Sequence, residues 1–364
     1  MSRNLRLSVI VPTFNRPNSI TNLIRALLPQ RAHIGEIIII DQGSAASPIY
    51  QELAEEQKNG WLSVIKQAVP SAARARNTGV RMAKYPIVLV LDDDIEIEND
   101  FVLRHIQNYS DPRVGAVQGA VIQPGRAMDA YIPYTFYLPY IGFAHFPLHH
   151  KQNRDGIANL PSGNMSIYRD YYLQIGGFDE QFEHLLFDDT DFSVRAWLVL
   201  QRAGKVIRHD AHAVARHLMT DEGRTRHGGM AEGVRLMSSH KQWDMIFYFY
   251  LKNFGWQGSW RELAVLLRLN LLRKPYFFKP AELLAAYREI RCGYNAARNR
   301  LREGMRLMPE CPAPLETGDL QNRDAYFWMS KEERSAARRR NYGGVIYTLR
   351  RMFQPGVDFE KTQC

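Results

Sequence analysis

Short apolar runs alternate with helical patterns over the first hundred residues of the chain. The runs are too short for buried helices and too continuously apolar for half-exposed strands, so they predict parallel strands covered on both faces. Apolar residues at helical spacing lie between the runs, from Pro17 onward, over Ile49–Lys58 and over Ser71–Ala83. The expected strands are Leu7–Val11, Glu36–Asp41, Trp61–Lys66 and Lys84–Asp94.

The pattern after residue 100 adds further strands and ends in helices. A long helical region, Arg235–Gly304, follows the last expected strand. Alternating strands and helices predict an α/β fold, a right-handed, doubly wound and mainly parallel sheet followed by a helical C-terminal region. The expected elements are helix Phe101–Tyr109, strands Val114–Ile122 and Asn164–Tyr168, a helical turn Asp170–Ile175, a helix from Asp189, and strands Lys205–His209 and Ala213–His217.

Polar side chains gather where the expected strands end. The first strand runs into Pro12–Arg16 (PTFNR), the second ends at Asp41, and the fourth stops in Asp92–Asp94; the turn Arg76–Gly79 lies before it. In a parallel sheet these segments share the carboxyl edge, where ligands of open α/β sheets bind. Carboxylates, guanidinium groups and polar backbone at one edge suit a nucleoside diphosphate, since Arg binds phosphate bidentately.

The aspartate triplet Asp92–Asp94 has two interpretations. Three adjacent carboxylates repel one another unless a positive group joins them. Hard oxygen ligands suit Mg²⁺ or Mn²⁺, which takes the rest of its shell from water and substrate phosphates. The alternative is an acidic turn in which Asp94 caps a following helix. The triplet taken alone favours neither.

Charge and cysteine content narrow the partner and the compartment. The chain holds 47 Lys and Arg against 38 Asp and Glu, with the densest basic patches at Arg334–Arg340 and Arg350–Arg351. This excess favours an anionic partner, such as nucleotide phosphates, an anionic membrane or nucleic acid. Three cysteines without a CxxC pair indicate neither a disulfide framework nor a zinc site. With no signal-peptide pattern and no apolar run of membrane-spanning length, we expect a cytoplasmic protein.

Three segments keep two interpretations each. The aromatic stretch Met128–His150 either covers the active face or fills a core beneath a long loop. The Gly-rich, basic loop Thr220–Gly233 is either a lid that closes over a diphosphate, through Arg224 and Arg226, or a plain linker. The C-terminal helices either pack on their own domain or lie on a membrane surface.

Six motifs together make the chain resemble glycosyltransferase family 2, whose members have the GT-A fold. The motifs are VIVPTFNR, IIIID, ARARNTG, LDDD, GGFDE and FDDTDFSVR, in this order, and the resemblance covers about residues 5–220. Each motif alone is weak, whereas the order and spacing together are specific. The resemblance implies an inverting transferase that uses Mn²⁺ or Mg²⁺ and a sugar linked to UDP, dTDP or GDP.

The resemblance also implies roles for single residues. Asp94 is the expected metal ligand, and His217 is either a second ligand or structural. Asp189 matches the catalytic base. Asp188, where the family more often has Glu, supports it, and Asp191 either supports the site or caps the helix. Asp93 is the variable middle residue, expected to tolerate substitution best. The residues expected to contact the nucleotide are Pro12, Thr13, Arg16, Asp41, Arg74, Arg76, Asp92 and Asp93.

The resemblance sets the expected domains and acceptor as well. We expect a catalytic domain over residues 1–235, with a nucleotide-sugar half over about 1–125 and an acceptor half over about 126–235. A helical extension (236–304) and a basic, partly disordered tail (305–364) follow. A Gln-x-x-Arg-Trp element, the mark of processive relatives, is absent from the sequence, so we expect transfer of one or a few sugars to a glycan or lipid-linked acceptor, with the basic tail on the inner face of the cell membrane.

Three other classes of function fit less well. A nucleotidyltransferase shares an acidic metal site on an α/β sheet but needs a Gly-rich phosphate loop after the first strand. A dinucleotide-dependent oxidoreductase needs G-x-G-x-x-G there. A nucleic-acid binder explains the charge but not the carboxylates at several strand ends, which repel phosphate backbones. We therefore expect no nucleic-acid partner.

Overall fold

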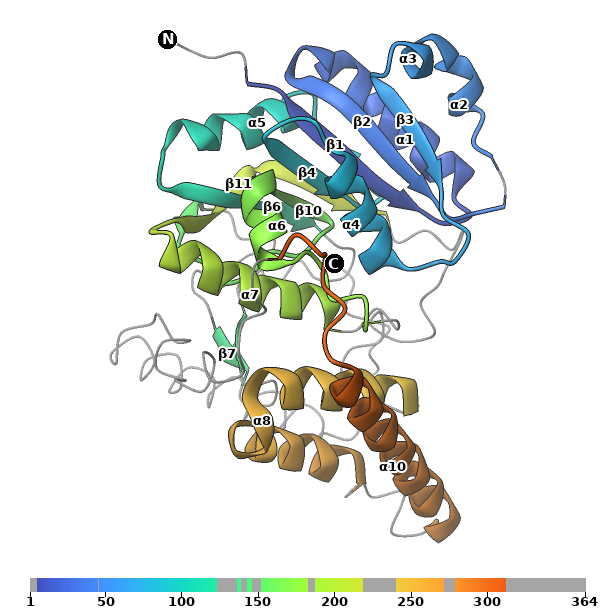
Figure 1. The fold of residues 1–364 in the computed structure, drawn as a ribbon, viewed down its shortest axis with the longest axis vertical. Helices are drawn as coiled ribbons and strands as arrows, with labels where there is room; N and C mark the ends of the chain where they lie inside the picture. The colour runs from blue at the N-terminus through green and yellow to red at the C-terminus, as the bar shows by residue number, and fades with distance from the viewer. Residues whose placement is uncertain are drawn as a thin grey trace, which may run out of the picture.

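The fold is a curled sheet between helices, with a pair of long helices beyond one face (Figure 1). Three features discussed above lie wholly or mostly outside the described residues: the stretch Met128–His150, the loop Thr220–Gly233 with Arg224 and Arg226, and the chain from residue 312. The computed structural model describes residues 5–44, 46–122, 136–138, 143–145, 152–182, 187–218, 240–271 and 279–311.

The main sheet has nine strands in the order β3-β2-β1-β4-β10-β6-β11-β5, with β9 paired to β11. Its first four strands are parallel, as the sequence predicts, and begin and end within a few residues of the predicted positions. The strands are β1 Leu7–Thr13, β2 Ile34–Asp41, β3 Leu62–Lys66, β4 Ile87–Leu91, β5 Ile95–Ile97, β6 Val114–Ile122, β9 Arg154–Asp155, β10 Asn164–Tyr168 and β11 Val206–His217. A separate hairpin pairs β7 Phe136–Leu138 with β8 Phe143–His145.

Helices cover both faces of the sheet, which explains the continuous apolar runs. Successive residues of one strand enter different cores: Val9 and Val11 pack under α1 and α5, whereas Ile10 packs with α4, α6 and α7. Alternate side chains of a strand point to opposite faces, so an apolar run needs two cores. The helices are α1 Pro17–Leu27, η1 Leu28–His33, α2 Ile49–Glu52, α3 Ala54–Lys58, α4 Ala72–Met82, α5 Phe101–Gln107, η2 Asn108–Ser110, α6 Arg169–Ile175 and α7 Asp188–Arg202.

Strand β10 breaks the parallel pattern. It lies between β4 and β6 and is antiparallel to both. The carboxyl end of β4 therefore meets the beginning of β10, where Asp92 N–H donates to Gly163 O at 3.4 Å. This junction places the segment before β10 beside the aspartate triplet.

The last two predicted strands form one long strand, β11, whose register against β6 shifts between Asp210 and Val214. Its end is antiparallel to β5, with His217 opposite Ile95. The residues that follow the triplet thus form a strand, and the alternative in which Asp94 caps a helix is wrong. Leu218 N–H donates to Asp94 O at 2.8 Å, which fixes the end of β11 against the triplet.

The C-terminal region forms two long helices, α8 His240–Leu271 and α10 Pro280–Glu303, which pack on each other. A kink at Gly255, with φ 60° and ψ −177°, divides α8. The part of α8 before the kink contributes Trp243, Ile246 and Phe249 to the core shared with α7. Among the described helices, none is both long and apolar enough to cross a bilayer.

Candidate active site

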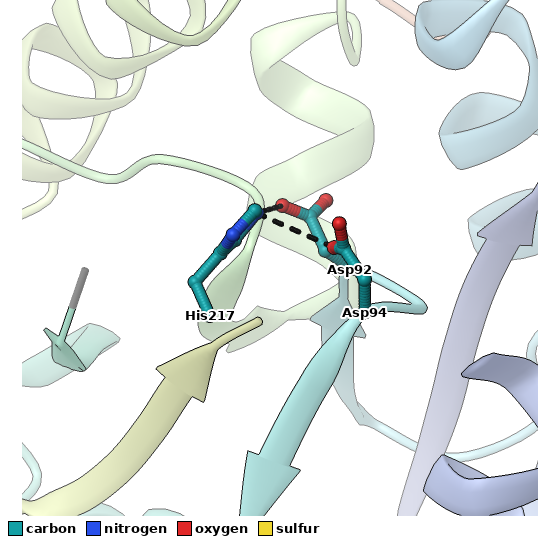
Figure 2. A group of neighbouring side chains, drawn as sticks. All are labelled: Asp92, Asp94 and His217. Carbon is teal, nitrogen blue, oxygen red and sulfur yellow. Dashed lines mark ion pairs between the residues drawn. The ribbon is translucent and has the colours of Figure 1, made fainter. Parts of the chain in front are cut away.

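A cluster of two carboxylates and an imidazole lies at the carboxyl edge of the sheet (Figure 2). One ligand atom each from Asp92, Asp94 and His217 lies within 4.8 Å of the others. His217 Nε2 is 3.3 Å from Asp94 Oδ1 and 3.8 Å from Asp92 Oδ2. Carboxylate oxygens with one imidazole nitrogen suit Mn²⁺, and carboxylates with phosphate oxygens suit Mg²⁺ as well. The donor set therefore fits a divalent cation, with His217 beside the predicted ligand Asp94.

Backbone pairing brings this cluster together. Asp92 and Asp94 follow β4, and His217 ends β11, whose pairing with β5 sets it next to Asp94. Gly163 leaves room for Asp92, because a Cβ at this position would lie 2.7 Å from Asp92 Oδ2. Asp92 keeps 28% of its side chain exposed, whereas those of Asp94 and His217 are buried. The cluster is thus open on the Asp92 side.

Residues of β1 and of the loop after it bind the middle aspartate, Asp93. Its two carboxylate oxygens accept hydrogen bonds from Thr13 Oγ1 at 2.7 Å and Arg16 Nη1 at 2.8 Å. Burial raises the pKa of Asp93 to about 6, although the charge of Arg16 and the hydrogen bond from Thr13 oppose this shift. The tolerance expected of Asp93 stays a prediction, and these contacts argue against it. Arg16 also lies 3.0 Å from Asp94.

The predicted nucleobase residue, Asp41, ends β2 in a small recess. Its carboxylate accepts from Gly43 N–H at 2.9 Å and pairs with Lys66 Nζ at 2.9 Å. The recess is lined by Thr13, Asn15, Arg16, Pro17, Ile20, Asp41, Ser47 and Tyr50. Burial raises the pKa of the Tyr50 hydroxyl, and the neighbouring Asp41 adds to the shift. Asp41 therefore offers an acceptor beside a donor, Lys66, and a half-buried tyrosine, Tyr50.

Arg76 lies between the metal-type cluster and the aspartates of α7. Its Nη1 is 2.9 Å from Asp188 Oδ2 and its Nη2 is 3.9 Å from Asp92 Oδ1. The guanidinium also lies over the Phe178 ring, 4.8 Å from its centroid. Burial alone would lower the pKa of Arg76, but the charges of Asp189 and then Asp188 raise it, so the guanidinium stays charged. One buried cation thus contacts both a carboxylate that follows β4 and a carboxylate of α7.

The predicted base, Asp189, is the accessible member of its pair. Asp188 is buried against Arg76, whereas Asp189 is half-buried, and its Oδ1 accepts from Ser162 N–H at 2.9 Å. Ser162 precedes Gly163, the residue that touches Asp92. The adjacent residues Ser162 and Gly163 therefore link Asp189 to the metal-type cluster, because one contacts Asp189 and the other contacts Asp92.

Two predicted residues lie away from this cluster. Arg74 Nε pairs with Glu180 at 2.9 Å, and the Arg74 side chain is 41% exposed. Asp191 is fully buried and pairs with Arg195 and with Lys252 of α8, and no side chain caps the first turn of α7. Asp191 thus supports α7 and does not cap it. Pro12 lies within β1, opposite Ile40 of β2.

Sequence reasoning missed three residues of the site. Lys66 ends the third predicted strand, so the strand-end rule applied to Asp41 also indicates it. Ser162 stands directly before a predicted strand, in SGNM. Tyr50 carries no such signal, because it lies on α2, away from any strand end. The reach of Tyr50 to Asp41 depends on how the loop after β2 folds.

The comparisons with known proteins concern the family and the fold. Residues 8–176 match the family model described as Glycosyl transferase family 2. The crystal structure of GalNAc-T7 with UDP, GalNAc and Mn²⁺ superposes with a TM-score of 0.53 at 13% identity, covering 84% of this chain and 59% of that one. The superposition shows that the chain has the GT-A fold. The matched segment belongs to glycosyltransferase family 2. The family and the fold predicted from the sequence are therefore both confirmed.

Two curated relatives are polymer synthases. Chondroitin synthase of Pasteurella multocida (strain Pm70) is 25% identical over 223 residues, 54% of this chain and 23% of that protein. Poly-beta-1,6-N-acetyl-D-glucosamine synthase of Staphylococcus aureus is 28% identical over 114 residues, 31% of this chain and 28% of that protein. The chain thus spans about a quarter of the length of these relatives.

The Asp188–Arg76 pair predicts a pH dependence of stability. Burial, and then the charge of Asp189, raise the pKa of Asp188 from 3.8 to about 6. The folded state then binds this proton more tightly than the unfolded state, so the contribution is present at low pH and is lost as the pH rises from about 4 to about 6. The free energy of unfolding of the wild type and of Asp188→Asn can be measured in urea at several pH values. As the pH rises across this window, the wild type should lose stability relative to Asp188→Asn.

The control for this prediction is Asp170→Asn on α6, whose side chain is exposed. Its difference from the wild type should stay flat over the same pH range. A wild type that gains stability relative to Asp188→Asn as the pH rises would contradict the shift.

Proposed function

We propose that the protein is an inverting, metal-dependent and non-processive transferase that moves a sugar from a nucleoside diphosphate to a hydroxyl of a glycan or lipid-linked acceptor. One observation carries the proposal: Arg76 joins the Asp92–Asp94–His217 cluster to the turn of α7 that bears Asp189. A donor diphosphate and an acceptor hydroxyl then meet on opposite sides of one guanidinium.

On the donor side, the sheet edge orders the nucleotide from base to phosphate. Asp41 accepts a base N–H and Lys66 donates to a base carbonyl, a pairing that fits uracil, thymine and guanine alike. Asp94 and His217, with the more exposed Asp92, hold Mn²⁺ or Mg²⁺. The bound cation supplies a Lewis acid that neutralises charge on the departing diphosphate. The wide use of UDP-, dTDP- and GDP-sugars by this fold leaves all three as donors.

On the acceptor side, Asp189 removes the proton of the attacking hydroxyl. The acceptor oxygen forms a bond to the anomeric carbon while the bond from that carbon to the diphosphate oxygen breaks, and the electron pair leaves with the diphosphate. The proton ends on Asp189, which Ser162 N–H orients. Direct displacement by one base inverts the anomeric configuration. Asp188 stays paired with Arg76 and keeps that cation beside the leaving group.

The sequence and its relatives support the proposed acceptor and the number of sugars added. The sequence lacks Gln-x-x-Arg-Trp, which supports transfer of one or a few sugars. The two curated relatives are named for polymers, chondroitin and poly-beta-1,6-N-acetyl-D-glucosamine, so a growing glycan suits the acceptor. The catalytic domain proposed over residues 1–235 also needs α8, because Lys252 pairs with Asp191.

Removal of either side of the site should stop sugar transfer. Asp94→Asn removes a charge from the cation ligands, and Asp189→Asn removes the base, and a general base contributes about 10²–10⁴-fold in rate. Transfer from a nucleotide sugar, measured as release of nucleoside diphosphate, should fall by at least about 100-fold in each variant. Asp170→Asn should keep wild-type turnover. Robust turnover by folded Asp94→Asn or Asp189→Asn would end the assignment.

The donor and the stereochemistry follow from two linked measurements. A thermal-shift screen of nucleotide sugars with Mn²⁺ should find a donor that raises the melting temperature, because it binds only the folded state. EDTA should remove the shift. With that donor, proton NMR of the first product formed should show the anomeric configuration opposite to that of the donor. A product with retained configuration would contradict direct displacement.

A membrane surface is the partner we propose for the C-terminal helices. Trp256 and Trp260 are 55% and 56% exposed, and Arg298 and Arg302 line a groove of about 320 Å³ beside Trp256. Exposed tryptophans next to cations suit the interface of an anionic bilayer. The cytoplasmic location expected from the sequence stays a prediction.

The membrane proposal is tested by co-sedimentation with phosphatidylserine vesicles at low salt. The double variant Trp256→Ala/Trp260→Ala should pellet less than the wild type, by several-fold. The matched control, Val69→Ala/Met82→Ala, removes two exposed apolar side chains far from these helices and should pellet as the wild type does. Equal pelleting of all three proteins would contradict a membrane contact at Trp256 and Trp260.

A further inference from the structure

The first turn of α7, which carries Asp188 and Asp189, is held in place by residues of α8. The first contact is at Asp191, whose side chain is fully buried. Asp191 Oδ1 lies 2.6 Å from Lys252 Nζ and accepts from Asn253 Nδ2 at 3.0 Å, while Oδ2 accepts from Arg195 within α7. Two consecutive residues of α8 thus bind the turn two residues beyond the base.

Lys252 connects this turn to a second motif. Its Nζ also lies 2.9 Å from Asp179 Oδ2, in the GGFDE segment, and Tyr248 donates to the same oxygen at 2.8 Å. The charge of Lys252 lowers the pKa of Asp179 to about 2 despite burial, so the carboxylate is ionised at neutral pH. Asp179 Oδ1 in turn accepts from the backbone N–H groups of Gln181 and Arg306. One buried ammonium therefore joins α8 both to the first turn of α7 and to the GGFDE segment.

An aromatic contact holds the same turn from its other end. Phe187, directly before α7, has φ 66° and ψ 0°, a left-handed conformation that is unfavourable for a bulky residue. Its ring stacks on Phe249 of α8, with centroids 4.7 Å apart and an interplanar angle of 14°, and meets Tyr250 edge-on at 6.1 Å. Such strain persists only where the surroundings enforce it. The rings of α8 do so at the residue that sets the direction of Asp188 and Asp189.

Packing alone does not account for these contacts. Buried ion pairs often stabilise a fold no better than apolar side chains of similar size, since both charges lose water. An apolar α8 would also cover α7, but it would make no directional contacts to the first turn. The charged pair and hydrogen bond at Asp191 add such contacts to those of Asp188 with Arg76 and of Asp189 with Ser162. These contacts lie at the end of α7 that bears Asp188 and Asp189.

We propose that α8 positions the catalytic base, with Lys252 as the main positioning residue and Phe249 as its partner at Phe187. The inference rests on the proposed role of Asp189 as base. Lys252 touches no substrate in this account; it acts through Asp191 and the turn. A displacement of about 1 Å at a reacting group costs on the order of 100-fold in rate, so small movements of this turn are sufficient.

Lys252→Met keeps the aliphatic stem and removes the ammonium. We expect kcat to fall by about 10- to 100-fold while the KM for the donor stays within about twofold, because the donor side of the site is untouched. Lys241→Met is the matched control, the same change on an exposed residue of the same helix, and should leave both constants unchanged. Lys252→Arg, which restores a cation, should recover part of kcat.

Two milder variants keep the test decisive if Lys252→Met does not fold. Phe249→Leu removes the stack on Phe187, and Asn253→Ala removes one hydrogen bond to Asp191. Each should lower kcat more than it raises the donor KM, at a temperature well below its melting transition. Wild-type kcat in both variants, or an equal change of kcat and donor affinity with no rescue by Lys252→Arg, would overturn the proposal.

Asp189→Asn separates this inference from the proposed function. If Asp189→Asn is inactive and Lys252→Met keeps wild-type kcat, only the positioning role fails. If Asp189→Asn is fully active, Asp189 is not the base and both fail.

Discussion

The contact between Arg76 and the carboxylates around it is the interaction on which the site depends. Its guanidinium is buried, lies 2.9 Å from Asp188 and 3.9 Å from Asp92, and rests on the ring of Phe178. Without this cation, aspartates from β4 and α7 would face one another in a buried region, where like charges strongly disfavour ionisation. With it, carboxylates from the end of β4 and from the start of α7 lie against one cation.

The sequence does not distinguish the partly exposed aspartates of the motifs from those that are buried against α8. Asp92 and Asp189 stay partly exposed. Asp179 and Asp191 are buried and pair with Lys252. The C-terminal helix α8 is therefore joined by buried ion pairs to the segments that carry the last two motifs.

Local patterns were sufficient to predict the parallel half of the sheet, because apolar runs such as Ile87–Leu91 require cover on both faces. The carboxylates at the strand ends were predictable as well, because parallel strands end at the same edge of the sheet. The position of β10 was not, since an antiparallel strand between β4 and β6 depends on pairing across the fold. His217 reaches Asp94 only through the pairing of β5 with β11. The contacts of Lys252 likewise join residues more than sixty positions apart, and no local pattern encodes them.

The central claim is that Asp92, Asp94 and His217 form one cation site separate from the base. Titration with Mn²⁺, followed by the electron paramagnetic resonance signal of the free ion, measures this directly. The account predicts one site per chain in the presence of a nucleoside diphosphate, lost in Asp94→Asn, weakened in His217→Ala and retained in Asp189→Asn. Equal Mn²⁺ binding by Asp94→Asn and the wild type, or loss of binding in Asp189→Asn, would contradict it.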